Sequence, residues 1–356
     1  MRAAVVGTGF IGAVHVEALR RIGVEVTGVV GSTPERARAR PGLPEPYQSF
    51  EALLDDEGVD VVHLATPNHL HYPQACAVLA AGKHVVCEKP LALTSAESGE
   101  LVALGEAAGR VHCTNYNLRF YPLCHEARER VRRGELGRIW NAHGSYLQDW
   151  LHEPSDWSWR IDPELGGPLR AVADIGSHWL DLTAWISGRR VSEVCADLAT
   201  VHETRDPNRP VMTEDVANVL LRYEDGMRGQ VTISQVSAGR KNDLSFELDG
   251  SESALAWSSE RHEQLWLGRR DEPNQLLRRD PALLSQSLRG DAPGGHAEGF
   301  ADTFKELYRA VYRAVQSGAM PAEPDFPTFE DGHEQILVGE AIAESARTGS
   351  WEEVRR

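Results

Sequence analysis

Two stretches of this sequence combine residue types that can move a proton. Asp174 and His178 lie four residues apart, so a helix would carry both on one face. A carboxylate beside an imidazole is a plausible proton-transfer pair. Lys89 stands between a short apolar run and Pro90, and a lysine held in a cleft suits the same chemistry. The ordinary alternatives are an Asp that caps the helix, a half-buried His and a surface lysine.

A third stretch, at the start of the chain, is suited to a dinucleotide. Gly7, Gly9 and Gly12 have the spacing G-x-G-x-x-G, with an apolar run before them and a helix-forming run after them. Gly7 permits the tight turn, Gly9 lets a pyrophosphate approach the backbone, and Gly12 lets the helix pack against the strand. The first N–H groups of that helix then face the phosphates. We therefore predict cofactor contacts from Gly7, Gly9, Phe10, Ile11 and Gly12, against the alternative of an ordinary glycine-rich turn.

The end of the second apolar run bears on the choice of cofactor. Sites that bind NAD usually carry a carboxylate there, about 20 residues beyond the glycines, which bonds the ribose hydroxyls. In this chain the run 24–30 is followed by Gly31, and no carboxylate stands at that place. Ser32, Thr33 and Arg36 could instead receive the 2′-phosphate of NADP. The sequence thus favours NADP as the cofactor. The alternative is that NAD binds without the carboxylate and that Arg36 is merely solvated.

Polar residues also follow the third apolar run. Ala65, Thr66, Asn68 and His71 stand where a strand of a parallel sheet would end and face the ligand crevice, so we predict that they contact the cofactor. His69 and His71 could suggest a metal, but no cysteine or carboxylate nearby completes a ligand set. We therefore predict no metal site, and the alternative reading of these histidines is a loop without a role.

The elements that would position these residues change character along the chain. Apolar runs alternate with helix-forming segments in the first half, at 3–6, 24–30, 59–65, 84–87 and 111–114. Strands separated by helices imply a parallel sheet with right-handed crossovers. We therefore predict an α/β fold whose N-terminal domain, residues 1–122, is a doubly wound Rossmann domain.

The strands of the second half follow one another and alternate between apolar and polar residues, as 244–249 do. Period two over consecutive strands indicates an antiparallel sheet with one face that is polar or covered by a partner. Residues 123–356 are thus predicted to form an α+β domain for substrate binding and oligomerisation. Helices expected on its other face include 179–186, 300–316 and 331–347. Because the outer face needs a cover, we predict a homodimer or homotetramer packed sheet to sheet.

Composition excludes some classes of function. The chain has 356 residues, with 37 Lys and Arg against 53 Asp and Glu, so its formal net charge is -16. This balance argues against a nucleic-acid or anionic-membrane surface. No apolar run approaches the roughly 18 residues of a membrane span. The five cysteines are scattered and odd in number, which favours reduced thiols and a cytoplasmic location.

Taken in order, these motifs resemble one family. Gly7–Gly12, Thr66-Pro67-Asn68, Glu88-Lys89-Pro90 and the 174–178 stretch are similar to the glucose-fructose oxidoreductase, inositol dehydrogenase and rhizopine catabolism (Gfo/Idh/MocA) family. The resemblance covers nearly the whole chain, down to 345–349. It implies a Rossmann domain, then an α/β domain with an open antiparallel sheet. It also implies NAD(P)-dependent oxidation or reduction of a sugar, a polyol or a similar secondary alcohol.

The resemblance further implies roles for single residues. Residues that match Lys89, Asp174 and His178 form the catalytic set of such enzymes, Glu88 belongs with the cofactor contacts, and Asn117 matches a segment near the nicotinamide. The absent carboxylate after the second strand departs from the family's pattern and bears on the choice between NAD and NADP.

A substrate pocket can be sought in the segment 140–185, which is rich in tryptophan. Tyr146 and Gln148 share one face of a strand by period two, and Trp159 and Arg160 precede a Gly-Gly turn. Aromatic faces beside polar groups suit a sugar ring, whereas tryptophans that fill a core are the alternative. The predicted substrate-binding residues are Lys89, Asn117, Tyr146, Gln148, Trp159, Arg160, Asp174 and His178.

Two other functions use the same fold. A nicotinamide-binding sensor would not need the proton-transfer set, so the presence of Lys89, Asp174 and His178 argues against it. A glycoside-cleaving enzyme that oxidises and re-reduces a sugar while it keeps its NAD(P) stays open as an alternative to a dehydrogenase.

Overall fold

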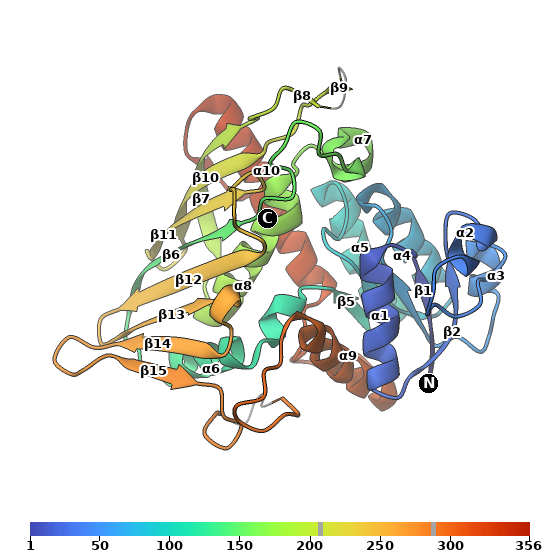
Figure 1. Cartoon of the computed structure of the whole chain (residues 1–356), viewed down its shortest axis with the longest axis horizontal. Helices are drawn as coiled ribbons and strands as arrows, with labels where there is room; N and C mark the ends of the chain where they lie inside the picture. The colour runs from blue at the N-terminus through green and yellow to red at the C-terminus, as the bar shows by residue number, and fades with distance from the viewer. Residues whose placement is uncertain (206–208, 286–289) are drawn as a thin grey trace. The chain divides into compact units, whose positions relative to one another are not determined.

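A computed structural model, drawn in Figure 1, describes residues 1–205, 209–285 and 290–356. The chain divides into two compact units. The first unit contains residues 1–117 and 301–336, and the second contains 118–300 and 337–356. The domain boundary after residue 122 stays a prediction. The chain thus returns to its first unit after it has built most of the second.

The first unit is built on a parallel sheet of five strands, which confirms the doubly wound prediction. Its strands lie in the order β2-β1-β3-β4-β5, and each neighbouring pair is parallel. Their bounds are β1 (Arg2–Val6), β2 (Glu25–Val30), β3 (Val61–Leu64), β4 (His84–Cys87) and β5 (His112–Thr114). The order reverses between β1 and β3, and ligands of such sheets bind at the carboxyl ends of strands beside this switch point.

Helices join these strands, so that β3 and β4 are buried at every residue. They are α1 (Phe10–Arg21), α2 (Pro34–Arg38), α3 (Phe50–Leu54), α4 (His71–Ala80) and α5 (Ser95–Ala108), with 3₁₀ turns η1 (Asn68–Leu70) and η2 (Asn117–Phe120). Local sequence sets their ends: Thr94 and Glu97 form a capping box at the start of α5, and Gly109 ends it with a left-handed φ of 58°.

Helix α9 (Phe300–Ser317) corrects one expectation. We expected residues 300–316 on the sheet of the second domain, but from Ala301 onward α9 belongs to the first unit. Tyr308 packs on the rings of His15 and His63, with ring centroids 5.3 and 4.7 Å apart. Hydrophobic periodicity shows that a helix has an apolar face, but not which sheet that face covers.

The second unit is built on a nine-stranded, mainly antiparallel sheet, as predicted. Its order is β15-β14-β13-β12-β6-β11-β10-β7-β16, and among the described strand pairs of this sheet only β6–β11 is parallel. The strands are β6 (Ile139–Leu147), β7 (Val191–Ala199), β10 (Val216–Tyr223), β11 (Arg228–Ser234), β12 (Asp243–Gly250), β13 (Ala254–Ser258), β14 (Gln264–Gly268), β15 (Gln275–Arg278) and β16 (Glu352–Glu353). A separate pair joins β8 (Thr204–Arg205) and β9 (Arg209–Pro210).

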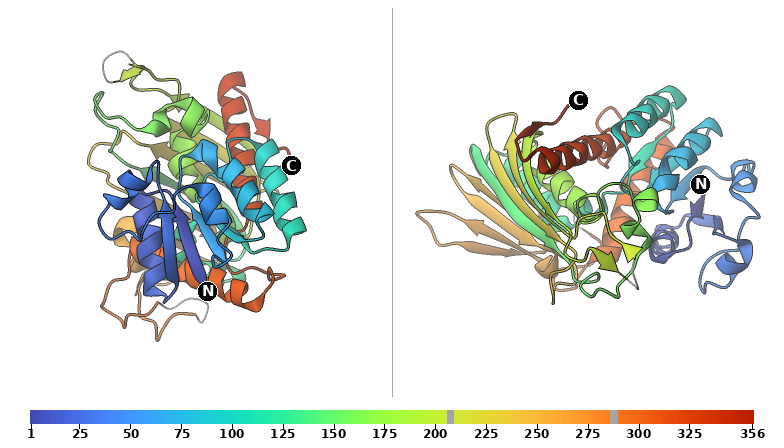
Figure 2. Two further views of the ribbon diagram at one scale, coloured as in Figure 1. Left: turned by 90° about the vertical axis from the view of Figure 1, so that its right-hand side faces the viewer. Right: turned by 90° about the horizontal axis from the view of Figure 1, so that it is seen from above.

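One face of this sheet packs on the core of the second unit. Along strands such as β10 and β12, every second side chain points to the opposite face. The core face is covered by α6 (Pro122–Arg132), α8 (Ser177–Ser187) and the part of α10 (Phe329–Thr348) that lies in this unit, as Figure 2 shows. Trp179 of α8 is buried and donates from Nε1 to the Ser245 carbonyl over 2.9 Å. A Cβ on Gly144 would lie 2.0 Å from that carbonyl oxygen, so only glycine fits beneath the indole. Short segments α7 (Pro163–Gly166) and η3 (Trp159–Ile161) complete the unit.

Across the described part of the chain, no helix combines the length and the apolar character that crossing a bilayer requires.

Acid should destabilise the second unit through His125 of α6. Burial, and then the charges of Arg128 and Arg119, lower the pKa of His125 to about 3. The folded protein therefore keeps this imidazole neutral, whereas the unfolded chain binds a proton below an ordinary pKa of about 6.5. Between that pH and the folded pKa, the free energy of unfolding should fall by roughly 1.4 kcal/mol for each pH unit on account of this group.

Urea denaturation at several pH values between 7.5 and 4.5 measures this dependence. His125→Phe keeps an aromatic ring but removes the titration, so its pH dependence should be shallower by about one proton. The exposed His152→Asn is the control and should keep the dependence of the unmodified protein. An unchanged slope in His125→Phe would contradict the assignment.

Candidate active site

The glycine turn lies at the switch point of the first sheet, between the ends of β1 and β3. Gly7 has a φ of 110°, and a Cβ there would lie 2.2 Å from the Ala65 carbonyl oxygen. A Cβ on Gly12 would lie 2.0 Å from the Gly7 carbonyl oxygen. A Cβ on Gly9 would meet no described atom within 4 Å. Packing therefore requires glycine at two of the three positions, while Gly9 leaves open space over the backbone.

That open space adjoins the first turn of α1. Gly9 caps the helix without a side-chain hydrogen bond, so the first amide groups of α1 point outward with no carbonyl of the helix to accept them. The side chain of Phe10, the first residue of α1, is 74% exposed and is not packed into the core. Exposed amides at a positive helix end fit the pyrophosphate of a dinucleotide.

The predicted ribose end follows β2. Thr33 caps α2, and its hydroxyl oxygen accepts the amide of Arg36 over 3.2 Å. A Cβ on Gly31 would lie 3.0 Å from the Ala37 Cβ and 3.1 Å from the Thr8 hydroxyl, so a longer side chain would be crowded. Ser32 and Arg36 are both exposed beside this cap. The segment thus offers hydroxyl and guanidinium donors next to a short helix, and no carboxylate at the strand end.

The loop after β3 is held by His71, at the start of α4. Its Nδ1 lies 2.7 Å from the Pro90 carbonyl oxygen and its Nε2 lies 2.9 Å from the Thr66 carbonyl oxygen. The Thr66 hydroxyl donates to Gln74 over 2.7 Å, and Asn68 is buried in η1. Both ring nitrogens of His71 are therefore occupied by the backbone, and the imidazole joins the loop after β3 to the loop that carries Lys89.

A buried polar chain beneath Lys89 escaped the sequence analysis. Glu88 follows β4, and its carboxylate accepts the Lys89 amide over 3.3 Å and the side-chain amide of Asn115. His15 Nε2 of α1 lies 3.1 Å from the same carboxylate, and His15 Nδ1 lies 3.1 Å from Nδ1 of His63. Burial, and then the charge of His15, hold the pKa of His63 well below its ordinary value.

The same chain reaches α9 and a neighbouring loop. His63 Nε2 lies 3.1 Å from the hydroxyl of Tyr312. Asn117, at the start of η2, donates from its side chain to Thr303 over 2.7 Å and is 2% exposed. Helix α9 thus contacts the buried chain that leads to the Glu88 carboxylate through Tyr312, and it binds the Asn117 side chain through Thr303.

In the second unit, Asp174 lies within an irregular turn and His178 lies in the first turn of the helix that follows it. Residues Val172–Gly176 form a π-helical turn before α8 begins at Ser177. The sequence predicted an ordinary helix here; π turns of this kind often occur at functional sites. Arg160 Nε donates to Asp174 Oδ1 over 3.1 Å, and Gln235 Nε2 donates to Asp174 Oδ2 over 2.8 Å. The Asp174 carboxylate is therefore fixed from two sides.

The side chain of Tyr146, on β6, lies beside His178 and begins a set of polar contacts that continues past the end of that strand. The ring of Tyr146 lies 6.3 Å from the ring of His178, and its hydroxyl donates to Asn242 Oδ1 over 2.7 Å. Gln148 donates to the same oxygen over 2.7 Å and accepts the indole N–H of Trp150. Burial raises the pKa of Tyr146 above its ordinary value, so the phenol stays neutral.

The remaining predicted pair is held together by stacking. The guanidinium of Arg160 lies 4.5 Å from the centre of the Trp159 ring. Tyr146, Gln148, Arg160, Asp174 and His178 thus belong to one connected region of the second unit. Sequence reasoning missed Asn242 and Gln235 there, because neither stands in a motif.

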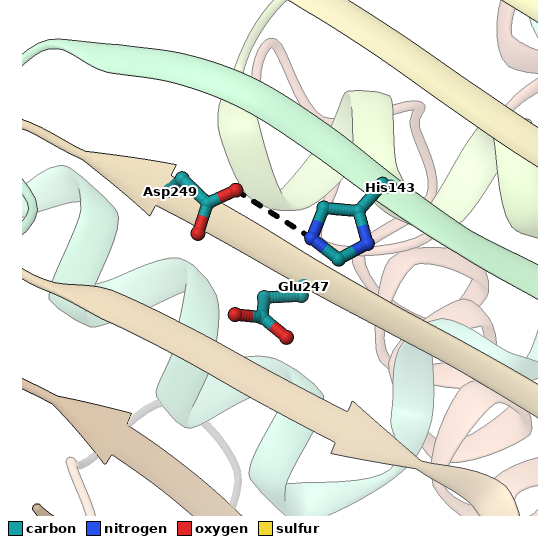
Figure 3. Close-up of side chains that lie close together, drawn as sticks. All are labelled: His143, Glu247 and Asp249. Atoms are coloured by element: carbon teal, nitrogen blue, oxygen red, sulfur yellow. Dashed lines mark ion pairs between the residues drawn. The ribbon is translucent and has the colours of Figure 1, made fainter.

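One further cluster combines ligand types that a metal can use. His143, Glu247 and Asp249 lie on the neighbouring strands β6 and β12, with their ligand atoms within 4.8 Å of one another, and are drawn in Figure 3. His143 Nε2 lies 3.5 Å from Asp249 Oδ2. All three are partly exposed, and pairing of an imidazole with carboxylates on a sheet surface accounts for them. The prediction that the protein uses no metal stays a prediction.

Comparisons with known proteins show sequence similarity in both units. The family model described as "Oxidoreductase family, NAD-binding Rossmann fold" matches residues 1–116, and the model "GFO/IDH/MocA C-terminal domain" matches 124–256. Levoglucosan dehydrogenase from Pseudarthrobacter phenanthrenivorans is 30% identical in an alignment 345 residues long, which covers 89% of this chain and 86% of the relative.

Solved structures agree with the two units. Levoglucosan dehydrogenase in complex with NADH and L-sorbose superimposes with a TM-score of 0.93 at 29% identity, over 100% of this chain and 99% of the other. An inositol dehydrogenase homolog from Azotobacter vinelandii, complexed with NADH and myo-inositol, gives a TM-score of 0.88 at 28% identity, over 99% and 97% of the chains.

The three glycines of the turn should respond differently to an added methyl group. Gly12→Ala forces a Cβ into the Gly7 carbonyl, so it should lower the free energy of unfolding by about 1–3 kcal/mol. Gly9→Ala meets open space at a φ of -74°, so it should cost no more than the exchange of a glycine N-cap for alanine, up to about 1 kcal/mol. The same methyl group stands where a pyrophosphate would approach, so dinucleotide affinity should drop.

Thermal denaturation and fluorescence titration with the reduced dinucleotide measure the two effects separately. If Gly9→Ala binds the dinucleotide as tightly as the unmodified protein does, the open space at Gly9 is not the phosphate site.

Proposed function

Because the chain belongs to the GFO/IDH/MocA oxidoreductase family, we propose that it transfers a hydride between a nicotinamide cofactor and a sugar, a glycoside or a cyclic polyol. The reacting group is a secondary alcohol or its ketone. The observation that carries this proposal is the polar region of the second unit, in which buried His178 lies beside Tyr146 and near an Asp174 carboxylate fixed by Arg160. Relatives with sugar or polyol substrates in their names support it.

The residues of the chain handle the proton in this scheme. A bound nicotinamide would supply or accept the hydride at the substrate carbon. His178 takes the hydroxyl proton during oxidation and returns it during reduction, while Lys89 donates a hydrogen bond to the same oxygen and stabilises its developing negative charge. Asp174 holds a neighbouring hydroxyl of the substrate through the geometry that Arg160 and Gln235 give it.

Both aromatic and polar side chains take part in the proposed recognition of the substrate. Tyr146, Gln148, Trp159 and Arg160 combine aromatic faces with hydrogen-bond donors, which suits a ring that presents both C–H faces and hydroxyl groups. Asn117 and Lys89 contribute from the cofactor side. We propose that these residues form the substrate contacts, together with Asp174 and His178.

The cofactor fits the first unit, and we propose that NADP is preferred. The open space over Gly9 and the free amides of α1 fit a dinucleotide of either kind. The end of β2 offers Ser32, Thr33 and Arg36 and no carboxylate, which favours a 2′-phosphate. The two structural relatives described above were solved with NADH.

Changing Ser32 should therefore move the cofactor preference. Ser32→Asp adds an acceptor for the ribose hydroxyls and repels the 2′-phosphate, so the ratio of Kd for NADP to Kd for NAD should rise. Arg36→Gln should weaken NADP more than NAD, because only the former carries the extra phosphate. Fluorescence titration of both cofactors gives the ratios, and a clear NAD preference in the unmodified protein would contradict the proposal.

Removing the proton-transfer residues tests the reaction itself. Lys89→Ala and His178→Ala should each lower kcat for a reactive polyol by roughly 10²-fold or more, the usual size of a positioned acid–base contribution. Cofactor affinity should change little, because the glycine turn holds the phosphates. Exposed Lys241→Ala is the matched control for Lys89.

A panel of sugars and inositols, followed at 340 nm with both cofactors, first identifies the substrate. Aryl glycosides added to the panel separate the glycoside-cleaving alternative, since that reaction releases the aglycone without net change in NAD(P)H. Full activity in His178→Ala would remove His178 from the mechanism.

We further propose a homodimer or homotetramer through the outer face of the nine-stranded sheet, and a cytoplasmic location. Leu220 and Leu276 are apolar yet 49% and 54% exposed on β10 and β15, and a hollow of about 550 Å³ lined by Trp266 and Leu276 lies over neighbouring strands. All five cysteines are free thiols, which supports a reducing compartment. Leu220→Glu should shift the molar mass by light scattering toward the monomer. A monomer in the unmodified protein at micromolar concentration would contradict the oligomer.

A further inference from the structure

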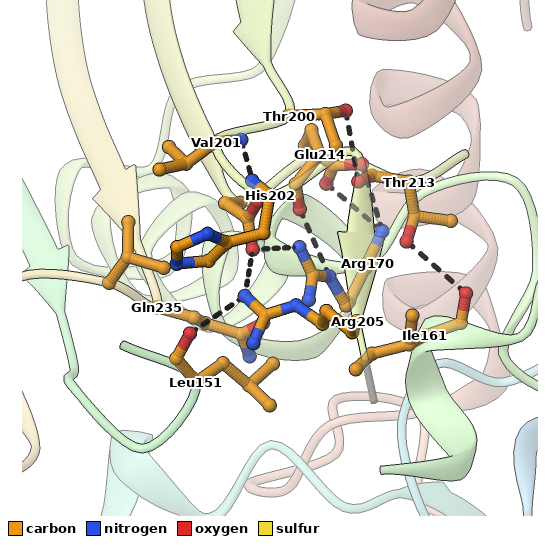
Figure 4. Close-up of polar contacts among 12 residues, drawn as sticks. Leu151, Ile161, Arg170, Thr200, Val201, His202, Arg205, Thr213, Glu214 and Gln235 are labelled. Atoms are coloured by element: carbon orange, nitrogen blue, oxygen red, sulfur yellow. Dashed lines mark hydrogen bonds and ion pairs between the residues drawn. The ribbon is translucent and has the colours of Figure 1, made fainter. Parts of the chain in front are cut away.

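Three consecutive side chains before β10 reach three different segments of the second unit. They are Thr213, Glu214 and Asp215, all at most 4% exposed. The Thr213 hydroxyl donates to the Ile161 carbonyl over 3.4 Å, next to Arg160. Glu214 and Asp215 bind other segments through the network drawn in Figure 4. The sequence analysis singled out none of these residues, and the proposed mechanism does not use them.

Glu214 caps the helix that carries Asp174 and His178. Its Oε1 accepts the amide of Val172 over 2.8 Å and that of Arg170 over 3.0 Å. These amides open the π turn, and no earlier carbonyl of that helix accepts them. A carboxylate at this end is also favoured by the helix dipole. Because Asp174 lies only two residues beyond Val172, its direction depends on where this cap holds the first turn.

Asp215 holds the segment that leads to Arg160. Its Oδ1 accepts hydrogen bonds from the guanidinium groups of Arg170 and Arg205, the latter over 2.9 Å. Arg205 in turn donates to the carbonyl oxygens of Leu151 and Glu153 over 2.7 and 2.8 Å. Both arginines are 1% exposed. The two buried cations, Arg170 and Arg205, are thus balanced by the carboxylates of Glu214 and Asp215. Arg205 also fixes the backbone shortly before Arg160.

A third connection runs through Gln235. Its amide donates to the Asp215 carbonyl over 3.0 Å, while its side chain donates to Asp174 Oδ2 over 2.8 Å. The cap on Val172, the Arg205 clamp and Gln235 therefore converge on the pair Arg160–Asp174. Buried ion pairs contribute little net stability compared with apolar packing, so stability alone does not explain so elaborate a network.

We propose that Glu214 is a positioning residue for the reaction, acting through Asp174, and that Asp215 and Arg205 position Arg160 in the same way. The inference rests on the proposed function, in which Asp174 and Arg160 contact the substrate. None of the three positioning residues touches the substrate itself. Their work is to hold a carboxylate and a guanidinium in the geometry that a polyol requires, since a displacement of about 1 Å can cost about 10²-fold in rate.

Conservative variants of Glu214 separate positioning from folding. Glu214→Asp keeps the charge but shortens the side chain, so it cannot reach both amides; kcat should fall about tenfold or more and KM for the polyol should rise. Glu214→Gln keeps an oxygen at the place of Oε1, so its loss should be several-fold smaller. Cofactor Kd, measured in the same variants, should stay within about twofold, because the dinucleotide binds the first unit.

Glu298→Gln is the matched control. Glu298 is 5% exposed, accepts the Asp291 amide over 2.9 Å and pairs with Arg279 over 3.1 Å. It is thus a buried carboxylate that accepts a backbone amide, as Glu214 does, but the partners named here lie in 279–291, away from the turn 170–176. It should lower stability without changing kcat or KM.

Hydrogen–deuterium exchange gives a second readout that needs no turnover. Amides in 170–176 should exchange faster in Glu214→Asp, and those in 151–161 should exchange faster in Arg205→Lys, which keeps the charge but loses the fork. The Glu298→Gln variant should leave both segments as in the unmodified protein. Circular dichroism and a cooperative melt show that each variant is folded.

These measurements distinguish a failure of the positioning role from a failure of the proposed function. Unchanged kcat and exchange in Glu214→Asp, or equal losses in Glu298→Gln, would overturn the positioning role. If the unmodified protein turns over no sugar or polyol of the panel, the proposed function fails. The exchange measurement then decides alone: faster exchange in 170–176 supports the role of Glu214 in holding the turn, and unchanged exchange overturns it.

Discussion

The backbone after β1 rests directly on the backbone after β3, and the first unit depends on this contact. A Cβ on Gly7 would lie 2.2 Å from the Ala65 carbonyl oxygen, and one on Gly12 would collide with Gly7 in turn. The two glycines let the strand ends and the first turn of α1 approach closely. Only because that approach is so tight does Gly9 stand over open space, with the amides of α1 beside it.

A buried carboxylate accepts backbone amides in both units, next to residues that we propose take part in the reaction. Glu88 accepts the amide of Lys89, and Glu214 accepts those of Arg170 and Val172. In each case a buried carboxylate binds the backbone next to a functional side chain. Glu88 is also contacted by the His15 imidazole, and the residue after Glu214, Asp215, binds two buried guanidinium groups. A buried polar group must be hydrogen-bonded to be tolerated. Satisfying that demand with backbone amides fixes the neighbouring loop or helix.

Prediction from sequence succeeded where the signal is local. The glycine spacing and the alternation of 244–249 are each written within a short stretch of sequence, and the architecture followed from such patterns. Contacts between distant segments were not predictable. His15 meets His63 across 48 positions, and Glu214 meets Arg170 across 44. A histidine inside the fully buried β3 was the one signal that a polar partner must exist. Nothing in the periodicity of α9 indicated which sheet it covers.

The hydrogen bonds of Asp174 also bear on the division of labour in the proposed reaction. Its two carboxylate oxygens already accept from Arg160 and Gln235. Were Asp174 to take the substrate proton, it would weaken both bonds and leave the Arg160 charge less well balanced. A carboxylate held in this way is better suited to accepting a hydrogen bond from a neighbouring hydroxyl, which requires no change in its charge. In the proposed reaction the proton then falls to His178, because imidazole is the side chain that most often serves as a general acid and base. On this proposal Asp174 orients the substrate, and Arg160 holds the Asp174 carboxylate in place.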